Sequence, residues 1–160
     1  MIYNINKPIG WTSFDVVKKI RNITKLKKVG HGGTLDPFAD GVLIIGVGKG
    51  TKLLTDIVNE KKSYNATLFL GEETDSLDNE GEIVKRKSVP KLNEDLVIKI
   101  LNSFLGRYIQ KPPMFSAKKV NGVPMYKLAR AGKEFEVKPQ NIEIFNLELI
   151  DYNYPKFTFK

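Results

Sequence analysis

Apolar residues recur at helical spacing in two segments of the chain. The first predicted helix runs from Ser13 to about Thr24 and begins with a Thr-Ser pair that is typical of a helix cap. Its apolar face is expected to consist of Phe14, Val17, Ile20 and Ile23. The second predicted helix lies in NEDLVIKILNSFLG, with Asn93 as its cap and Gly106 as its end. Its apolar positions are Leu96, Val97, Ile100, Leu101 and Phe104.

Strands are predicted where apolar residues alternate with polar ones or form a short run. These segments are Met1–Asn4, Gly41–Val47, Tyr64–Leu70 and Ile142–Ile150. Residues 64–70 alternate in the way a half-buried strand does. The final residues, YPKFTFK, alternate aromatic and polar side chains and indicate one more strand. The pattern predicts a mixed α/β organisation without internal repeats.

The charge along the chain is uneven, and its distribution indicates which class of partner to expect. The net charge is +8. Residues 1–35 and 107–138 each carry a balance of +6, whereas residues 60–95 carry −3. Two basic blocks are typical of a protein that faces a polyanion, and nucleic acid is the commonest polyanion. A solvated, lysine-rich surface explains the same charges equally well.

Several kinds of site are disfavoured by the residues present. The chain has no cysteine, and His31 is its only histidine, so zinc centres, thiol chemistry and Ser-His-Asp triads are poorly supported. GVGKGTK departs from a phosphate-binding loop at two positions, and DSLDNEGE does not place its carboxylates as a calcium loop does. No segment resembles a signal peptide or a membrane helix. We expect no metal, no cofactor, no membrane association and a cytoplasmic location.

The stretch VGHGGTLDPFADGVLIIGVGKGTK, residues 29–52, contains an aspartate in an unusual setting. Its glycines permit uncommon backbone angles, and Pro37 biases Asp36 toward an extended conformation. A short carboxylate is thereby held just before a predicted core strand. On these residues alone, an aspartate that caps a turn or a helix remains the more frequent interpretation.

Four motifs together resemble the TruB family of tRNA pseudouridine synthases. They are NKPIGWTSFDVVKKIR, VGHGGTLDPFADGVLIIGVGKGTK, KKSYNATLFLGEETDSLD and QKPPMFSAKKVNGVPMYKLARAG, and the resemblance runs from about Asn4 to the last residue. It implies the pseudouridine synthase fold, a mixed, mostly antiparallel sheet flanked by helices. It also implies a tRNA pseudouridine-55 synthase that isomerises a uridine in the T stem-loop of tRNA. The resemblance further implies that no cofactor is needed, and we expect a monomer.

The resemblance also implies roles for individual residues. Asp36 matches the catalytic nucleophile, His31 the histidine that holds the RNA loop open, and Tyr64 the tyrosine that stacks on the target base. Positions implied to shape the cleft and bind RNA are Lys7, Lys119, Tyr126 and Arg130. An aromatic side chain suits a base extruded from stacked RNA, because its face replaces the lost stacking.

The sequence departs from the family pattern in three places. Gly32 and Ser76 stand where threonine is more usual. The Gly-Thr-Tyr-Ile-Arg segment, whose arginine pairs with the nucleophilic aspartate, does not occur in residues 1–160. The resemblance therefore implies the N-terminal portion of a truncated catalytic domain, without the C-terminal RNA-binding domain, and we expect weak or no activity from this chain alone. A guide-RNA-dependent relative and a non-catalytic tRNA-binding or chaperone fragment are the alternatives.

Overall fold

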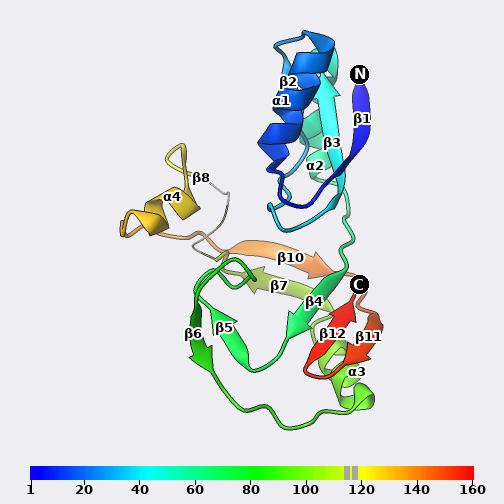
Figure 1. Ribbon diagram of the computed structural model, residues 1–160, viewed down its shortest axis with the longest axis vertical. Coiled ribbons are helices and arrows are strands. Elements are labelled where there is room, and N and C mark those ends of the chain that lie inside the picture. The colour runs from blue at the N-terminus through cyan, green and yellow to red at the C-terminus, as the bar shows by residue number, and fades with distance from the viewer. Residues whose placement is uncertain (114–115, 117–118) are drawn as a thin grey trace. The chain divides into compact units, whose positions relative to one another are not determined.

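A computed structural model describes residues 1–113, 116 and 119–160, and the chain forms two units (Figure 1). Unit 1 is Met1–Lys62 and unit 2 is Ser63–Lys160. Each unit has a hydrophobic core of its own. Every strand pairing among the described residues is antiparallel.

Unit 1 is a small sheet with one long helix. In chain order it contains β1 (Ile2–Lys7), α1 (Ser13–Thr24), β2 (Val29–His31), β3 (Gly41–Val47), the 3-10 helix η1 (Gly48–Leu53) and α2 (Leu54–Val58). The strand order is β1-β3-β2, so the apolar run of β3 is paired on both sides. The register joins Lys7 to Gly41 and His31 to Ile45. The loop between β2 and β3 therefore lies outside the sheet.

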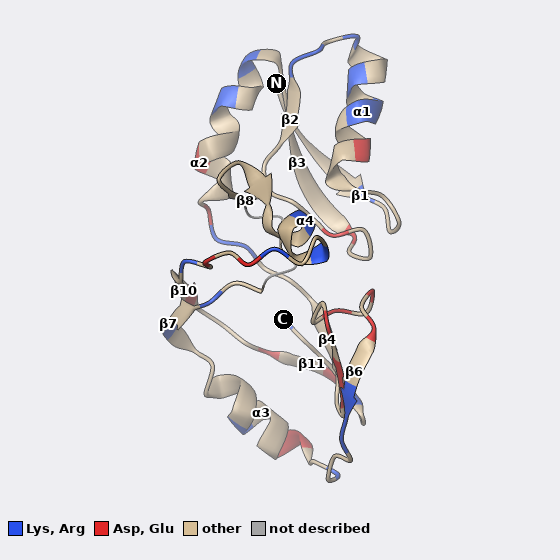
Figure 2. Ribbon diagram, turned by 90° about the vertical axis from the view of Figure 1, so that its left-hand side faces the viewer, with Lys and Arg blue, Asp and Glu red and all other residues tan. Residues whose placement is uncertain are grey.

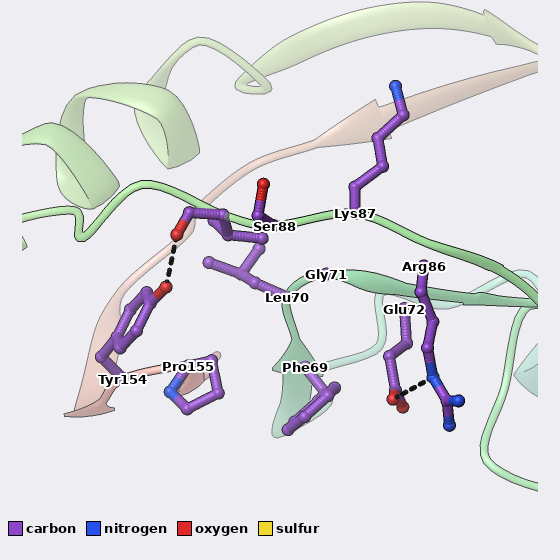
Figure 3. Close-up of a pocket in the computed structure, with 10 residues that line it drawn as sticks. Phe69, Leu70, Gly71, Glu72, Arg86, Lys87, Ser88, Tyr154 and Pro155 are labelled. Carbon is purple, nitrogen blue, oxygen red and sulfur yellow. Dashed lines mark hydrogen bonds and ion pairs between the residues drawn. The ribbon is translucent and has the colours of Figure 1, made fainter.

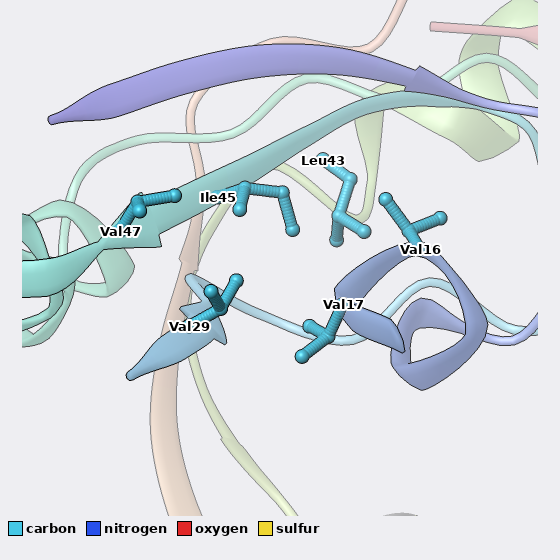
Figure 4. Packing of buried hydrophobic residues seen from close by; sticks show 6 residues of the cluster. All are labelled: Val16, Val17, Val29, Leu43, Ile45 and Val47. Atoms are coloured by element: carbon cyan, nitrogen blue, oxygen red, sulfur yellow. The ribbon is translucent and has the colours of Figure 1, made fainter. Parts of the chain in front are cut away.

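The core of unit 1 lies between α1 and the sheet, as Figure 4 shows. Its buried members are Val16, Val17, Val29, Leu43, Ile45 and Val47. Alternate residues of β3 point to the same face because successive side chains of a strand point to opposite faces. The predicted bounds of α1 and β3 are confirmed.

The predicted apolar face of α1 is wrong in part. Phe14 is 50% exposed and Ile23 is 65% exposed, whereas Val16 is buried. The ammonium of Lys18 lies 5.2 Å from the centroid of the Phe14 ring, and the guanidinium of Arg21 lies 5.6 Å from it. The ring thus has cation–π partners on the outer surface, and the sheet packs on a neighbouring face of the helix.

Unit 2 is built from short strands and two helices. In chain order it contains β4 (Ala66–Phe69), β5 (Glu72–Thr74), β6 (Ile83–Arg86), α3 (Glu94–Asn102), β7 (Gly106–Gln110), β8 (Lys119–Val120), β9 (Val123–Pro124), α4 (Met125–Arg130), β10 (Gln140–Ile144), β11 (Leu149–Asn153) and β12 (Lys156–Phe159). Its sheets have the orders β11-β12-β4, β10-β7, β5-β6 and β8-β9. The core brings Val97 and Leu101 of α3 against Phe157 of β12.

Several predicted boundaries in unit 2 are wrong. The predicted strand over residues 142–150 is two strands, β10 and β11, and β4 begins only at Ala66. The second predicted helix has its expected Asn93 cap but ends at Asn102. Gly106 has a φ of +109°, which glycine adopts readily, and it opens β7. Of the other predicted apolar positions, Leu96 and Ile100 of α3 are exposed, and Phe104, which lies after the end of α3, is exposed as well.

Candidate active site

Asp36 lies in the loop between β2 and β3 of unit 1, and its residue is exposed. The backbone turns directly after it, because the Ala39 N–H donates to the Asp36 carbonyl oxygen over 3.1 Å. The loop leads into the central strand β3 at Gly41. A carboxylate in this place is accessible to a large substrate.

The residues on both sides of Asp36 are held by Ser13, the first residue of α1, and by Gly10, which lies between β1 and α1. The Ser13 Oγ accepts from the Leu35 N–H at 2.9 Å and donates to the Leu35 carbonyl at 3.1 Å. The Gly10 N–H donates to the Pro37 carbonyl at 2.8 Å. Gly10 has a φ of +82°, a conformation that favours glycine.

Lys7 ends β1 and is fully buried. Its ammonium donates to the Pro8 carbonyl at 3.0 Å and to the Trp11 carbonyl at 2.7 Å. Both acceptors belong to the segment that carries Gly10. In this structure Lys7 therefore orders the backbone next to the Asp36 loop and does not present its charge to solvent.

His31 ends β2, five residues before Asp36 in the same connection to β3. Its ring is half-buried, and Nδ1 bonds to the Gly33 carbonyl. Because a carbonyl oxygen only accepts, Nδ1 is the nitrogen that carries the proton. In the neutral ring, Nε2 is then an acceptor. The structure thus brings two predicted site residues, Asp36 and His31, into one loop region.

The other predicted site residues belong to unit 2. Tyr64 precedes β4 and is 59% exposed, so its ring is accessible for stacking. In α4, the Arg130 guanidinium lies 5.7 Å from the centroid of the Tyr126 ring. Lys119 pairs with Pro124 in the β8–β9 hairpin. Part of the predicted Ser-Ala-x-Lys segment, residues 117 and 118, lies outside the described residues.

Comparison with known proteins decides the family. The family model described as "TruB family pseudouridylate synthase (N terminal domain)" matches residues 21–160. This chain belongs to the TruB family.

Curated relatives of the same family are similar over nearly the whole chain. A protein named tRNA pseudouridine synthase B from Clostridium tetani is 47% identical over 159 residues, which are 99% of this chain and 55% of that relative. One of the same name from Dehalococcoides mccartyi is 49% identical over 96% of this chain and 51% of its own length. The chain spans about half the length of these two relatives.

Solved structures of related proteins share the fold. A chain in the crystal structure of a Cbf5-Nop10-Gar1 complex superposes with a TM-score of 0.68 at 28% identity, over 99% of this chain and 37% of that one. A chain in an H/ACA RNP bound to a substrate RNA containing 2'-deoxyuridine gives 0.66 at 25% identity, over 99% of this chain and 36% of that one. The predicted pseudouridine synthase fold is confirmed.

Two lysines and one aspartate line a hollow near the candidate nucleophile, and the Lys18 ammonium lies 3.5 Å from an Asp15 carboxylate oxygen. A hollow in unit 1 is lined by Gly10, Trp11, Asp15, Lys18, Lys19 and Asn22. Because Gly10 also bonds to Pro37, this hollow adjoins the Asp36 loop. Figure 2 shows the Lys and Arg residues of α1 in blue. Trp11 is 40% exposed, so the hollow offers an aromatic surface together with ammonium groups.

The supporting contacts of Ser13 and Gly10 have no specific signature in the local sequence. Thr12-Ser13 was interpretable only as a helix cap, and the structure shows that Thr12 alone is the N-cap. Ser13 instead bonds to Leu35, 22 positions away, and a local sequence pattern does not predict a contact at that separation. The sequence signal was the second hydroxyl, that of Ser13 beside Thr12, although one hydroxyl suffices for an N-cap.

Another hollow, in unit 2, contains none of the predicted site residues (Figure 3). It lies where the end of β4, the end of β6 and the turn before β12 meet. The Tyr154 hydroxyl closes it by donating to the Val89 carbonyl at 2.7 Å, and Arg86 Nε lies 3.1 Å from a Glu72 carboxylate oxygen. These polar groups already have partners, so we assign this hollow no part in the site.

Among residues 1–113, 116 and 119–160, no group of three or more His, Cys, Asp or Glu side chains is placed to hold a metal ion. The expectation of a reaction without metal or cofactor stays a prediction. No helix in the described part of the chain is long and apolar enough to cross a membrane.

Proposed function

We propose that the protein containing this chain is a tRNA pseudouridine synthase that isomerises a uridine in the T loop, with Asp36 as the nucleophile. The observation that carries the proposal is an exposed carboxylate whose two neighbours in the chain are anchored, in a member of the TruB family. A nucleophile needs accessibility and a defined direction of approach together.

The reaction requires little beyond this arrangement. The bond from ribose C1′ to N1 of the uracil breaks, and a bond from C1′ to C5 forms. The hydrogen on C5 leaves and N1 takes up a proton, so the product is an isomer and no oxidant or reductant takes part. Asp36 would supply the carboxylate that allows the base to leave, turn and rejoin.

Extrusion of the target base requires further residues that bind the base and the surrounding RNA. The target nucleotide must leave its stack before Asp36 reaches it, which costs a few kcal/mol. The exposed ring of Tyr64 would replace the lost stacking, and His31, fixed through Nδ1, would help hold the RNA loop open. The ammonium groups beside Trp11 would contact phosphates, as cationic grooves with aromatic residues do on single strands.

Two further aspects belong to the same proposal. We expect a monomer that acts in the cytoplasm on tRNA without a guide RNA. The curated relatives at 47% and 49% identity carry the name tRNA pseudouridine synthase B, whereas the chain in the Cbf5 complex is 28% identical. This difference favours direct tRNA recognition over the guide-dependent alternative.

The test measures tritium released from [5-³H]uridine in an unmodified tRNA transcript, because the C5 hydrogen is lost in the isomerisation. The chain is assayed alone and joined to the remaining half of the Clostridium tetani relative. We expect weak or no release from the chain alone and turnover from the joined protein. Release that required an added guide RNA would favour the guide-dependent alternative.

Asp36→Asn in the joined protein should abolish release and leave tRNA binding largely intact, because the amide keeps the shape and loses the nucleophile. Asp40→Asn is the matched control, since Asp40 is an exposed carboxylate in the same loop. Normal turnover by Asp36→Asn would show that the catalytic assignment is wrong. Salt-sensitive tRNA binding without any product from the unsubstituted joined protein would favour the non-catalytic RNA-binding alternative.

A further inference from the structure

We propose that Ser13 is a positioning residue that sets the direction of the Asp36 carboxylate; the inference rests on the proposed function of Asp36. Ser13 is 3% exposed, and Lys7 and Ser13 are the buried polar residues of the described chain. Its hydroxyl makes two hydrogen bonds to the backbone of Leu35, the residue directly before Asp36. One side chain thereby satisfies both the donor and the acceptor of a single loop residue.

These two bonds orient the peptide groups on both sides of Leu35. The Leu35 N–H belongs to the peptide that joins it to Thr34, and the Leu35 carbonyl belongs to the peptide that joins it to Asp36. Leu35 also packs its side chain against the core of unit 1. On the other side of Asp36, the Pro37 carbonyl is held by Gly10 at 2.8 Å. Asp36 therefore lies between two residues whose backbone groups are held, and the residue itself is exposed.

The Ser13 hydroxyl is not needed for its own helix. Thr12 is the N-cap of α1: its Oγ1 accepts from the Asp15 N–H at 3.1 Å, and the Asp15 carboxylate accepts from the Thr12 N–H at 3.1 Å. This capping box satisfies the helix start without Ser13. Loss of the Thr12 hydroxyl thus weakens the same helix end but leaves both bonds to Leu35, which makes Thr12→Ala a matched control.

The first measurement is amide hydrogen exchange in the 160-residue chain. Ser13→Ala removes the acceptor of the Leu35 N–H, so exchange at Leu35 should become about tenfold faster. Ser13→Cys, which is close in size and bonds weakly through sulfur, should change exchange in the same direction by less. Thr12→Ala should leave Leu35 at its original rate. Unchanged exchange at Leu35 in both Ser13 variants would overturn the proposal.

The second measurement is the single-turnover rate of the joined protein with tRNA in the bound state. A misdirected nucleophile should lower this rate about 10- to 100-fold in Ser13→Ala without changing the Kd for tRNA. A merely structural role would lower the Tm and leave the rate of the folded variant at the level of Thr12→Ala. Ser13 variants that fold and turn over normally would therefore contradict the inference.

The outcomes separate the inference from the proposed function. If Asp36→Asn retains turnover while Leu35 exchange is faster in Ser13→Ala, the function proposed for Asp36 fails and the contact of Ser13 with the loop stands. If Asp36→Asn is inactive and Ser13→Ala matches the unsubstituted protein in rate and exchange, only the positioning role fails. The exchange measurement tests the contact of Ser13 with Leu35 in the 160-residue chain even if that chain has no activity.

Discussion

Lys7→Met should destabilise unit 1, because the buried ammonium of Lys7 holds two backbone carbonyls. The ammonium of this fully buried lysine donates to two carbonyls, those of Pro8 and Trp11. Methionine fills a similar volume and removes the ammonium. The Pro8 carbonyl would still accept from the Trp11 N–H at 3.4 Å, whereas the bond to the Trp11 carbonyl, at 2.7 Å, would be lost without replacement.

The size of the effect follows from these contacts. An acceptor that loses its partner costs up to about 1–3 kcal/mol when it is fully shielded from water, and less here because Trp11 is 40% exposed. Removal of a buried ammonium also abolishes its desolvation penalty, which offsets part of that cost. We therefore expect the free energy of unfolding to fall by about 1–2 kcal/mol. For a unit of this size each kcal/mol corresponds to about 4–8 °C in Tm.

The assay is urea unfolding followed by the fluorescence of Trp11, the one tryptophan of the sequence. This reporter belongs to the segment that Lys7 holds, so it detects the affected unit. Lys19→Met is the control, because Lys19 is exposed on α1 and its loss should change stability by no more than about 0.5 kcal/mol. Equal midpoints for Lys7→Met and the unsubstituted chain would refute the reasoning.

Two other predictions concern α1. The hydrogen bonds from the side chain and backbone of Thr12 lower the pKa of Asp15 from its usual value of 3.8. The carboxylate therefore stabilises the fold above about pH 4 and loses that contribution as the pH falls through the lowered pKa. The urea midpoint should therefore change less between pH 6 and pH 2 in Asp15→Asn than in the unsubstituted chain. The same change of midpoint in both proteins would contradict this prediction. Lys19→Gln should weaken tRNA binding and lower the slope of log Kd against log salt by about 1. Lys52→Gln is the control and should leave the slope unchanged, because Lys52 lies in η1, which follows the end of β3 opposite to the Asp36 loop. Equal slopes would exclude a phosphate contact by Lys19.

The parts of the fold that the sequence predicted well carry their information locally. The start of α1 is set by Thr12 and Asp15, the start of α3 by Asn93, and β3 by an uninterrupted apolar run. The errors arise where tertiary contacts decide. Phe14 satisfies the helical pattern yet lies outside, because cations cover its ring and the sheet packs elsewhere.

The split of residues 142–150 into two strands has a similar origin. The apolar pattern continues through both strands, but β10 pairs with β7 while β11 pairs with β12. Phe145, between the strands, is 58% exposed even though its residue type favours burial. Pairing partners are distant in the chain, so hydrophobic periodicity alone does not reveal where one strand ends and the next begins.

At the candidate site, too, the local sequence predicts some residues, whereas contacts between residues distant in the chain are visible only in the structure. Asp36 was predicted from its motif, whereas the residues that support it are recognisable only in three dimensions. Asp36 is exposed, so burial of its own side chain does not fix its position. The adjacent backbone is held by Ser13 at Leu35 and by Gly10 at Pro37. Lys7 extends this support from inside the fold, because it holds the segment from which Gly10 reaches the loop. In the proposed reaction, residues 7–13 would thus contribute through the position that they impose on the backbone around Asp36.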